Sequence, residues 1–149
     1  MSKAFQCHVI LLVEDNPGDV ELVKESLKEA GSAAQLHVAS DGNAALQFLR
    51  RTGPYRDAPR PDLMLLDLNM PLATGQQLLA VVKGDPDLRS IPVVILTSST
   101  AERDILMAYN LNANCYVTKP GELQNFMDLI ARVEAFWLRN YNADGPRDG

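Results

Sequence analysis

The sequence predicts a doubly wound α/β domain, in which a five-stranded parallel sheet is flanked by five helices. Five short apolar runs alternate with segments of helical period, and three of these runs are apolar almost throughout. Uninterrupted apolar runs are typical of parallel strands that are covered on both faces. The five predicted strands are Val9–Val13, Leu36–Ala39, Leu63–Asp67, Val93–Thr97 and Cys115–Thr118.

The segments between the runs carry local helix and loop signals. Asn16 followed by Pro17 fits an N-cap and a first-turn proline, and a capping box begins at Ser99. The last helix is predicted over Glu122–Tyr141. By contrast, Gly53–Pro61 contains three prolines and one glycine, so it predicts a loop.

The length and charge of the chain indicate a single domain and argue against nucleic-acid and membrane partners. Residues 1–141 of the 149 form one predicted domain, and the polar tail 142–149 is expected to be disordered. The formal net charge of -5 argues against a nucleic-acid surface, which needs clustered Lys and Arg. The apolar runs are far shorter than the roughly 20 residues of a membrane helix. No signal peptide is evident, so we expect a cytoplasmic protein without membrane or nucleic-acid partners.

The cysteines and histidines carry no recognisable chemistry. Cys7 and Cys115 lack the spacing of a metal site and are expected to remain free thiols. His8 and His37 lie in or beside predicted strands, where packed or solvated side chains are expected rather than catalytic ones.

Polar side chains stand where four of the apolar runs end. Glu14 and Asp15 follow the first run, and Lys119 follows the fifth. Asp67 ends the third run and Thr97 ends the fourth. Ligands of such folds bind beyond the carboxyl ends of the strands, so we expect these five side chains to converge.

This combination of groups predicts phosphoryl chemistry. Three neighbouring carboxylates repel one another until a proton or a cation relieves them, and oxygen ligands suit Mg²⁺. Beside such an ion, Asp67 could act as a nucleophile toward a phosphoryl group. Thr97 would donate a hydrogen bond to one phosphoryl oxygen, and Lys119 would pair with another.

The same residues resemble the receiver domain of two-component response regulators. Asp67 precedes Thr97 by 30 residues and Lys119 by 52, which matches the pattern of the chemotaxis regulator. The resemblance extends over about Val9 to Trp137 and implies a flavodoxin-like receiver fold with strand order 2-1-3-4-5. The matching elements are Glu14-Asp15, Asp67-Leu68-Asn69-Met70-Pro71 with Gly75, Thr97 and Lys119-Pro120.

The resemblance also implies a role for each site residue. Asp67 would accept the phosphoryl group from a sensor histidine kinase. Asp15 and Asp67 would bind Mg²⁺ directly together with the backbone carbonyl of Asn69, and Glu14 would act through water. Thr97 and Tyr116 resemble the switch pair of the family. Receivers keep a cis bond before the proline at position 120, although the sequence alone leaves the isomer open.

A narrower resemblance concerns the single-domain regulators paired with bacterial and cyanobacterial phytochromes. It rests on segments such as EDNPGDVEL and NANCYVTKP, on the long Pro-rich loop and on the Phe136-Trp137-Leu138 ending. It implies a phytochrome as the kinase. With no effector domain predicted, output would pass through protein contacts or through phosphoryl transfer to a phosphotransfer protein.

The last helix carries more apolar residues than one inward stripe can bury, which predicts a homodimer. The expected interface is the face of the fourth helix, fifth strand and fifth helix. Its residues on the last helix are Leu129, Val133, Phe136, Trp137 and Leu138.

Three other functions were compatible with parts of the pattern. A phosphatase of the haloacid dehalogenase class would need a second Asp two residues after Asp67, where Asn69 stands. A receiver-like module that no longer accepts phosphate would not need the intact site. A nucleotide-binding domain would need a glycine-rich phosphate loop, which is absent from the sequence. We therefore expect a protein that catalyses only its own phosphorylation and dephosphorylation, not an enzyme with a foreign substrate.

Overall fold

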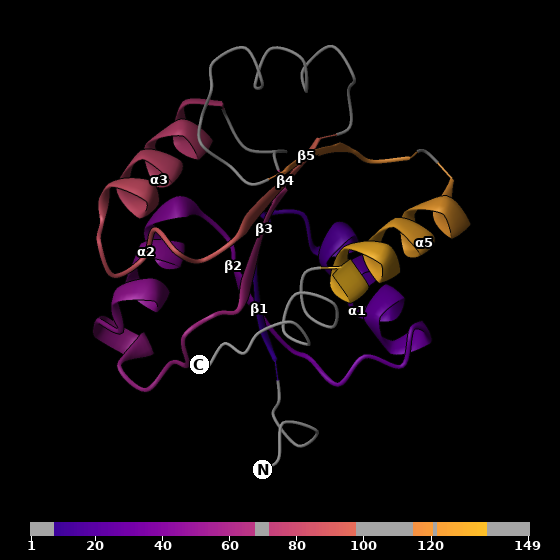
Figure 1. Cartoon of the computed structure of the whole chain (residues 1–149), viewed down its shortest axis with the longest axis horizontal. Coiled ribbons are helices and arrows are strands. Elements are labelled where there is room, and N and C mark those ends of the chain that lie inside the picture. The colour runs from indigo at the N-terminus through magenta and orange to yellow at the C-terminus, as the bar shows by residue number, and fades with distance from the viewer. Residues whose placement is uncertain (1–7, 68–71, 98–114, 121, 137–149) are drawn as a thin grey trace.

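The computed structural model describes residues 8–67, 72–97, 115–120 and 122–136, which form a parallel sheet with helices on both faces (Figure 1). The strands are β1 (Val9–Val13), β2 (Gln35–Ala39), β3 (Leu63–Asp67), β4 (Val93–Thr97) and β5 (Cys115–Thr118). All neighbouring strands are parallel, in the order β2-β1-β3-β4-β5. The five predicted strands and the expected strand order are therefore confirmed.

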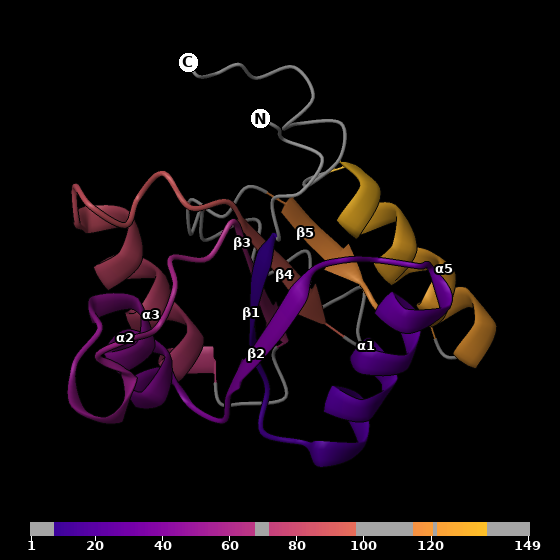
Figure 2. The same ribbon diagram turned by 90° about the horizontal axis from the view of Figure 1, so that it is seen from below.

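Within the described residues, two pairs of helices cover the sheet, one pair on each face (Figures 1 and 2). Helices α1 (Pro17–Glu29) and α5 (Leu123–Glu134) pack together on one face. Helices α2 (Gly42–Arg50) and α3 (Leu72–Gly84) lie on the other face. The helix predicted to begin at Ser99 and the predicted end of the last helix lie outside the described residues, as does the tail 142–149.

Local sequence signals place the first helix directly after the first strand. The Asn16 side chain accepts hydrogen bonds from the backbone N–H groups of Gly18 at 2.8 Å and Asp19 at 3.3 Å, and Pro17 opens the helix. The predicted cap is thus confirmed. Its effect is to hold the first turn of α1 at the carboxyl edge of the sheet, because the connection from β1 is only three residues long.

The central strands explain the uninterrupted apolar runs. Every residue of β1, β3 and β4 is buried, whereas β2 and β5 at the sheet edges are only partly buried. Their side chains alternate between two core clusters. Leu11 and Met64 pack with α2 and α3, and Ile10 and Leu65 pack with α1 and α5. The polar residues that end these strands are consequently held by rigid, fully packed backbone.

The loop and the remaining side chains mostly agree with the sequence. Gly53–Pro61 is a loop, with a short 3₁₀ turn at Gly53–Tyr55. The ring of His37 lies 5.2 Å from that of Phe48, between centroids, and packs away from the polar strand ends. Cys115 is a free thiol, and Cys7 lies outside the described residues. Across the described segments, no helix has the length and apolar character needed to cross a membrane.

Candidate functional site

The carboxyl edge of the sheet gathers buried polar residues from β1, β3 and β4. Glu14, directly after β1, is 1% exposed, while Asp67 and Thr97, which end β3 and β4, are fully buried. Lys119 follows β5 and is positioned through its backbone N–H, which donates to the Thr97 carbonyl oxygen at 2.6 Å. The fold thus brings four of the five residues that were predicted to converge to the same edge of the sheet.

Lys119 bridges two carboxylates. Its Nζ donates to Asp67 Oδ1 at 2.8 Å and to Asp19 Oδ2 at 3.2 Å. Burial lowers the pKa of Lys119, but the hydrogen bond and charge of Asp67, together with those of Asp19, outweigh burial, so the pKa lies above its usual value. The side chain is therefore a protonated ammonium at neutral pH, held against Asp67.

Three carboxylates meet beside this ammonium. Glu14, Asp19 and Asp67 can each present one oxygen so that the three oxygens lie within 4.8 Å of one another. Glu14 is oriented inward because its Oε2 accepts the backbone N–H of Asn16 at 2.9 Å. Such a set of oxygen ligands fits a hard divalent cation, which relieves the repulsion between the carboxylates.

The two oxygens of Asp67 have different surroundings. Oδ1 accepts the hydrogen bond from Lys119, whereas Oδ2 is buried and accepts no hydrogen bond from the residues that the structure describes. A buried carboxylate oxygen without a donor is costly for folding, and such atoms call for a ligand or a chemical role. This oxygen is the one available to a cation or to an electrophile.

Comparison with known proteins shows to which family a chain with this site belongs. Residues 10–131 match the family described as response regulator receiver domain. The chain belongs to this family. It is 46% identical over 130 residues to the response regulator Rcp1 of Synechocystis sp. (strain ATCC 27184 / PCC 6803 / Kazusa), covering 87% of this chain and 88% of that protein. It is thus a two-component response regulator and not a conventional enzyme.

Solved structures of receivers agree with the fold. The phosphorylated cyanobacterial phytochrome response regulator RcpA superposes with a TM-score of 0.81 at 42% identity, covering 90% of this chain and 96% of that one. The Mn²⁺-bound form of Rcp1 superposes with a TM-score of 0.78 at 45% identity, covering 89% and 96%. The receiver fold inferred from the strand-end residues is therefore shown independently of them.

Asp15 and Asp19, two acidic residues near the end of β1, have different surroundings in the structure of this receiver. Asp15, which the resemblance assigns to the metal, is exposed and does not belong to the three clustered carboxylates. Asp19, which the sequence analysis did not single out, belongs to the three clustered carboxylates and extends from the first turn of α1, while metal binding by Asp15 stays a prediction. The available signal was its position at the start of a helix that begins at the carboxyl edge.

Three further residues of the predicted site are Tyr116, Asn69 and Pro120, and the structure describes two of them, Tyr116 and Pro120. Tyr116 is half-buried and packs against the core cluster on the α2 and α3 side. Asn69, whose backbone carbonyl was expected to bind the metal, lies outside the described residues. No peptide bond among the described residues is cis, so the bond between Lys119 and Pro120 is trans, unlike the isomer that the resemblance implies.

The predicted interface residues on α5 differ in their surroundings. Val133 is 8% exposed and belongs to the core cluster shared with α1, so its side chain is not available to a partner, in contrast to the prediction. Leu129 is half-buried against the same cluster, and Phe136 is 58% exposed. Trp137 and Leu138 lie outside the described residues.

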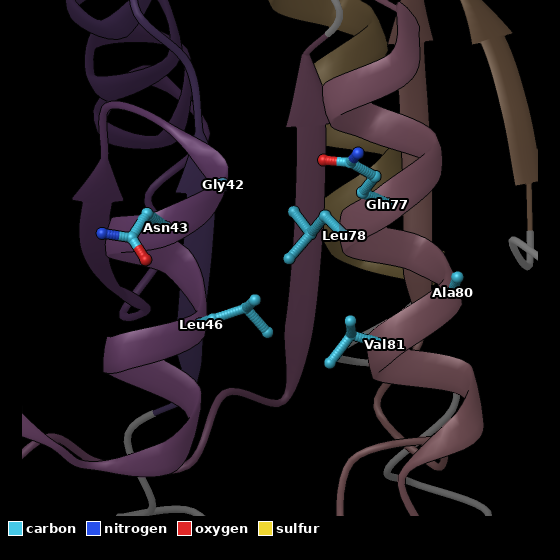
Figure 3. A pocket seen from close by; sticks show the side chains of 7 residues that line it. All are labelled: Gly42, Asn43, Leu46, Gln77, Leu78, Ala80 and Val81. Carbon is cyan, nitrogen blue, oxygen red and sulfur yellow. The ribbon is translucent and has the colours of Figure 1, made fainter.

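One pocket of the described residues lies away from this site. A hollow of about 530 Å³ opens between α2 and α3, where Leu46 faces Leu78 and Val81, with the amides of Asn43 and Gln77 nearby (Figure 3). None of the described residues that line it has an ionisable side chain. We therefore place the chemistry of the receiver at the carboxylate cluster rather than in this pocket.

Proposed function

We propose that this receiver accepts a phosphoryl group from a sensor histidine kinase onto Asp67 Oδ2. The observation that carries the proposal is the asymmetry of the Asp67 carboxylate, with Oδ1 held by Lys119 and Oδ2 buried without a donor. The donor-free oxygen is the better nucleophile, because it loses no hydrogen bond when it attacks phosphorus. Burial of Asp67 at the end of a packed strand fixes its direction of attack.

The transfer is a substitution at phosphorus. Oδ2 forms the new P–O bond as the P–N bond of the donor phosphohistidine breaks, and the imidazole leaves with that electron pair. Lys119, already 2.8 Å from Asp67, then pairs with a phosphoryl oxygen and stabilises its negative charge. Thr97, buried at the end of β4, is assigned a hydrogen bond to another phosphoryl oxygen. Through that bond Thr97, with Tyr116, would signal phosphorylation to the neighbouring surface.

A divalent cation, Mg²⁺, is part of the proposal. Glu14 and Asp67 offer buried carboxylate oxygens beside one another, and a bound Mg²⁺ would supply positive charge for the transferring oxygens. The relative Rcp1 has been crystallised with Mn²⁺, which supports a divalent cation in this chain as well.

The proposed kinase is a phytochrome. Support comes from relatives at 40% identity or more that are named phytochrome or bacteriophytochrome response regulators. A kinase of that kind would place this receiver in the cytoplasm. A phosphotransfer protein remains the proposed acceptor if the phosphoryl group is passed on.

The Asp67→Asn variant tests the acceptor. The amide has nearly the same shape but is not a nucleophile, so incubation with acetyl phosphate and Mg²⁺ should add no phosphoryl group by intact-protein mass spectrometry. Asp57→Asn is the matched control, because Asp57 is an exposed carboxylate of the loop, and it should gain one group as the natural chain does. Undiminished phosphorylation of Asp67→Asn would refute the assignment.

A homodimer through α5 and β5 is a second proposal, supported by the large exposed surface of Phe136 near the end of α5. Sedimentation at micromolar concentration should give about twice the 16.4 kDa chain mass, and Phe136→Glu should return it to the monomer value. Gln124→Glu introduces the same charge at an exposed site on the same helix and should leave the dimer intact. A monomer at all concentrations, with or without a phosphoryl analogue, would contradict the proposal.

A further inference from the structure

A second pocket lies at the amino edge of the sheet, opposite to Asp67. It is a hollow of about 420 Å³ between the end of α2 and the segment that joins α3 to β4. Its lining residues follow α2 and α3 or come just before β3 and β4, so they stand where these parallel strands begin. The pocket therefore shares no residue with the carboxylate cluster, where the strands end.

Two arginines of this pocket are paired with no carboxylate of the described residues. Arg60 donates to the backbone carbonyl oxygen of Asp87 at 2.6 Å and to Ser90 Oγ at 2.8 Å, and both acceptors are uncharged. The side chain of Arg51 makes no hydrogen bond or ion pair with any residue that the structure describes. Both guanidinium groups line the hollow with N–H donors to spare.

The backbone of Arg51 is in the left-handed region, with φ 57° and ψ 48°. Glycine is the usual residue at such a helix end, because the Cβ of other residues is crowded in this conformation. Among the described residues, Arg51 is the only non-glycine residue with a positive φ. A strained residue kept in place of a glycine points to a use for its side chain, and such residues cluster at ligand sites.

The end of α2 does not require the side chain of Arg51. The backbone N–H of Arg51 donates to the Phe48 carbonyl oxygen at 3.2 Å, and that of Thr52 donates to the Gln47 carbonyl oxygen at 3.0 Å. Any residue with a backbone N–H can make these bonds. The helix dipole favours a cation in the last turn, and Arg50 already supplies one there.

The charges of the lining favour an anion. Three arginines and two aspartates give the pocket one net positive charge, in a chain with a net charge of -5. Asp85 is engaged by Arg50, with Oδ2 and Nη2 3.8 Å apart, so its charge is in part neutralised. Arg51 and Arg60 remain, and the planar guanidinium group matches carboxylate and phosphate oxygens in pairs.

The remaining lining is apolar. Leu49, Leu88 and Ile91 are buried core residues that also line the hollow. An apolar wall beside a few charged groups is the usual composition of a small-molecule site, and the volume lies within the range of such sites. A bare inorganic ion would leave this wall uncovered, so the ligand should carry an apolar part.

We propose that this pocket binds a small organic anion, with a carboxylate or phosphate group on a short apolar body. Arg51 and Arg60 hold the anionic group, and the body packs on Leu49, Leu88 and Ile91. The site is separate from the proposed phosphoryl acceptor, and neither depends on the other.

Amide NMR titration of the metal-free protein tests the site with two probes, hexanoate and phenyl phosphate. At least one should bind saturably in the millimolar range and shift the signals of Arg51, Leu88 and Ile91, and the tighter of the two identifies the preferred anionic group. Hexanol is the matched neutral probe and should bind more weakly. No saturable binding of either anion, equal binding of hexanol, or shifts confined to the residues around Asp67 would each overturn the proposal.

The Arg51→Gly variant separates a binding role from a structural one. Loss of a charge-assisted hydrogen bond should weaken binding of the better probe about 10-fold or more. The melting temperature should stay the same or rise, because glycine adopts the left-handed backbone without strain. Arg56→Gln is the control, since Arg56 is an exposed arginine of the following loop that does not line the pocket.

The control should bind the probe as the natural chain does, and so should Asp67→Asn, because its substitution lies at the other edge of the sheet. Undiminished affinity in Arg51→Gly, or an equal loss in Arg56→Gln, would overturn the proposal. Loss of probe binding in Asp67→Asn would also contradict it, since the probe would then be bound at the phosphoryl acceptor.

Discussion

The two ends of the sheet each hold a partly buried lysine, and the two lysines have opposite pKa shifts. Lys83 lies in the last turn of α3 near the amino end of β4, where its Nζ donates to the carbonyl oxygens of Arg89 and Ile91, both at 3.1 Å. Burial lowers its pKa. Lys119 at the carboxyl end is also subject to burial, yet its pKa is raised by Asp67 and Asp19.

The difference lies in the charge of the partners described above. The carbonyl oxygens of Arg89 and Ile91 supply only partial charge to Lys83, whose pKa is lowered by burial. Carboxylates supply full negative charges, so at Lys119 attraction dominates. Lys83 therefore acts as a structural tie between α3 and the β4 approach, whereas Lys119 belongs to a site in which opposite charges are concentrated.

Removing each ammonium tests this contrast most strongly. Lys119→Met should lower the free energy of unfolding by about 3 kcal/mol, because it leaves buried Asp67 and Glu14 beside each other without a counter-charge. Lys83→Met should cost less, about 1 kcal/mol, the scale of its hydrogen bonds to the carbonyl oxygens of Arg89 and Ile91. Urea unfolding of both variants measures the difference.

Adding a divalent cation should enlarge the difference between the two variants. Added Mg²⁺ should restore more stability to Lys119→Met than to Lys83→Met, because only the first variant has excess negative charge at the carboxylate cluster. Equal costs for the two variants, or equal responses to Mg²⁺, would show that the two ends of the sheet are alike after all.

The two lysines should also give opposite pH dependences above neutrality. The raised pKa of Lys119 means that its stabilising contribution is fully present below the ordinary value of 10.5 and is lost as pH rises through the higher folded-state pKa. The lowered pKa of Lys83 means that its unfavourable contribution is present at neutral pH and is relieved as pH rises from that lowered value to 10.5.

Each contribution is read as the stability of the natural chain minus that of the corresponding Met variant, by unfolding between about pH 8 and pH 11. The difference for Lys119 should fall toward the alkaline end, and the difference for Lys83 should rise. Parallel trends in the two series would contradict the assigned partners.

A smaller effect is expected at a second neutral contact on the amino side of the sheet. Arg60 donates to the carbonyl oxygen of Asp87 at 2.6 Å and to Ser90 Oγ at 2.8 Å, which ties the loop before β3 to the loop before β4. Arg60→Ala should cost about 0.5 kcal/mol and leave acceptance of phosphoryl groups unchanged. Arg56→Ala, an exposed arginine of the same loop, is the control and should cost less.

The polar residues at the ends of the predicted parallel strands were enough to predict most of the site. Glu14, Asp67, Thr97 and Lys119 end or follow apolar runs, and parallel pairing brings such positions together without knowledge of any rotamer. The order of the strands came from the family resemblance, because apolar patterns alone do not distinguish one parallel order from another. The fold and four of the site residues were therefore accessible from the sequence.

The remaining features depend on side-chain geometry. An acidic residue in a helix first turn, such as Asp19, is explained sufficiently by the helix dipole, so its contact with Lys119 left no separate signal. Asp15 and Glu14 are adjacent, and it takes the structure, with the buried Glu14 accepting a hydrogen bond from Asn16, to show which one turns inward. Val133 was assigned to a surface because its apolar character does not say which neighbour buries it.

The central claim is that Asp67 is the residue that carries the phosphoryl group. Borohydride reduction converts an aspartyl phosphate to homoserine, which peptide mass spectrometry locates in the sequence. After incubation with acetyl phosphate and Mg²⁺, homoserine should be found at position 67, and Asp15 and Asp19 should be unreduced. A reduced residue at one of those positions or at Glu14, with Asp67 unchanged, would contradict the account.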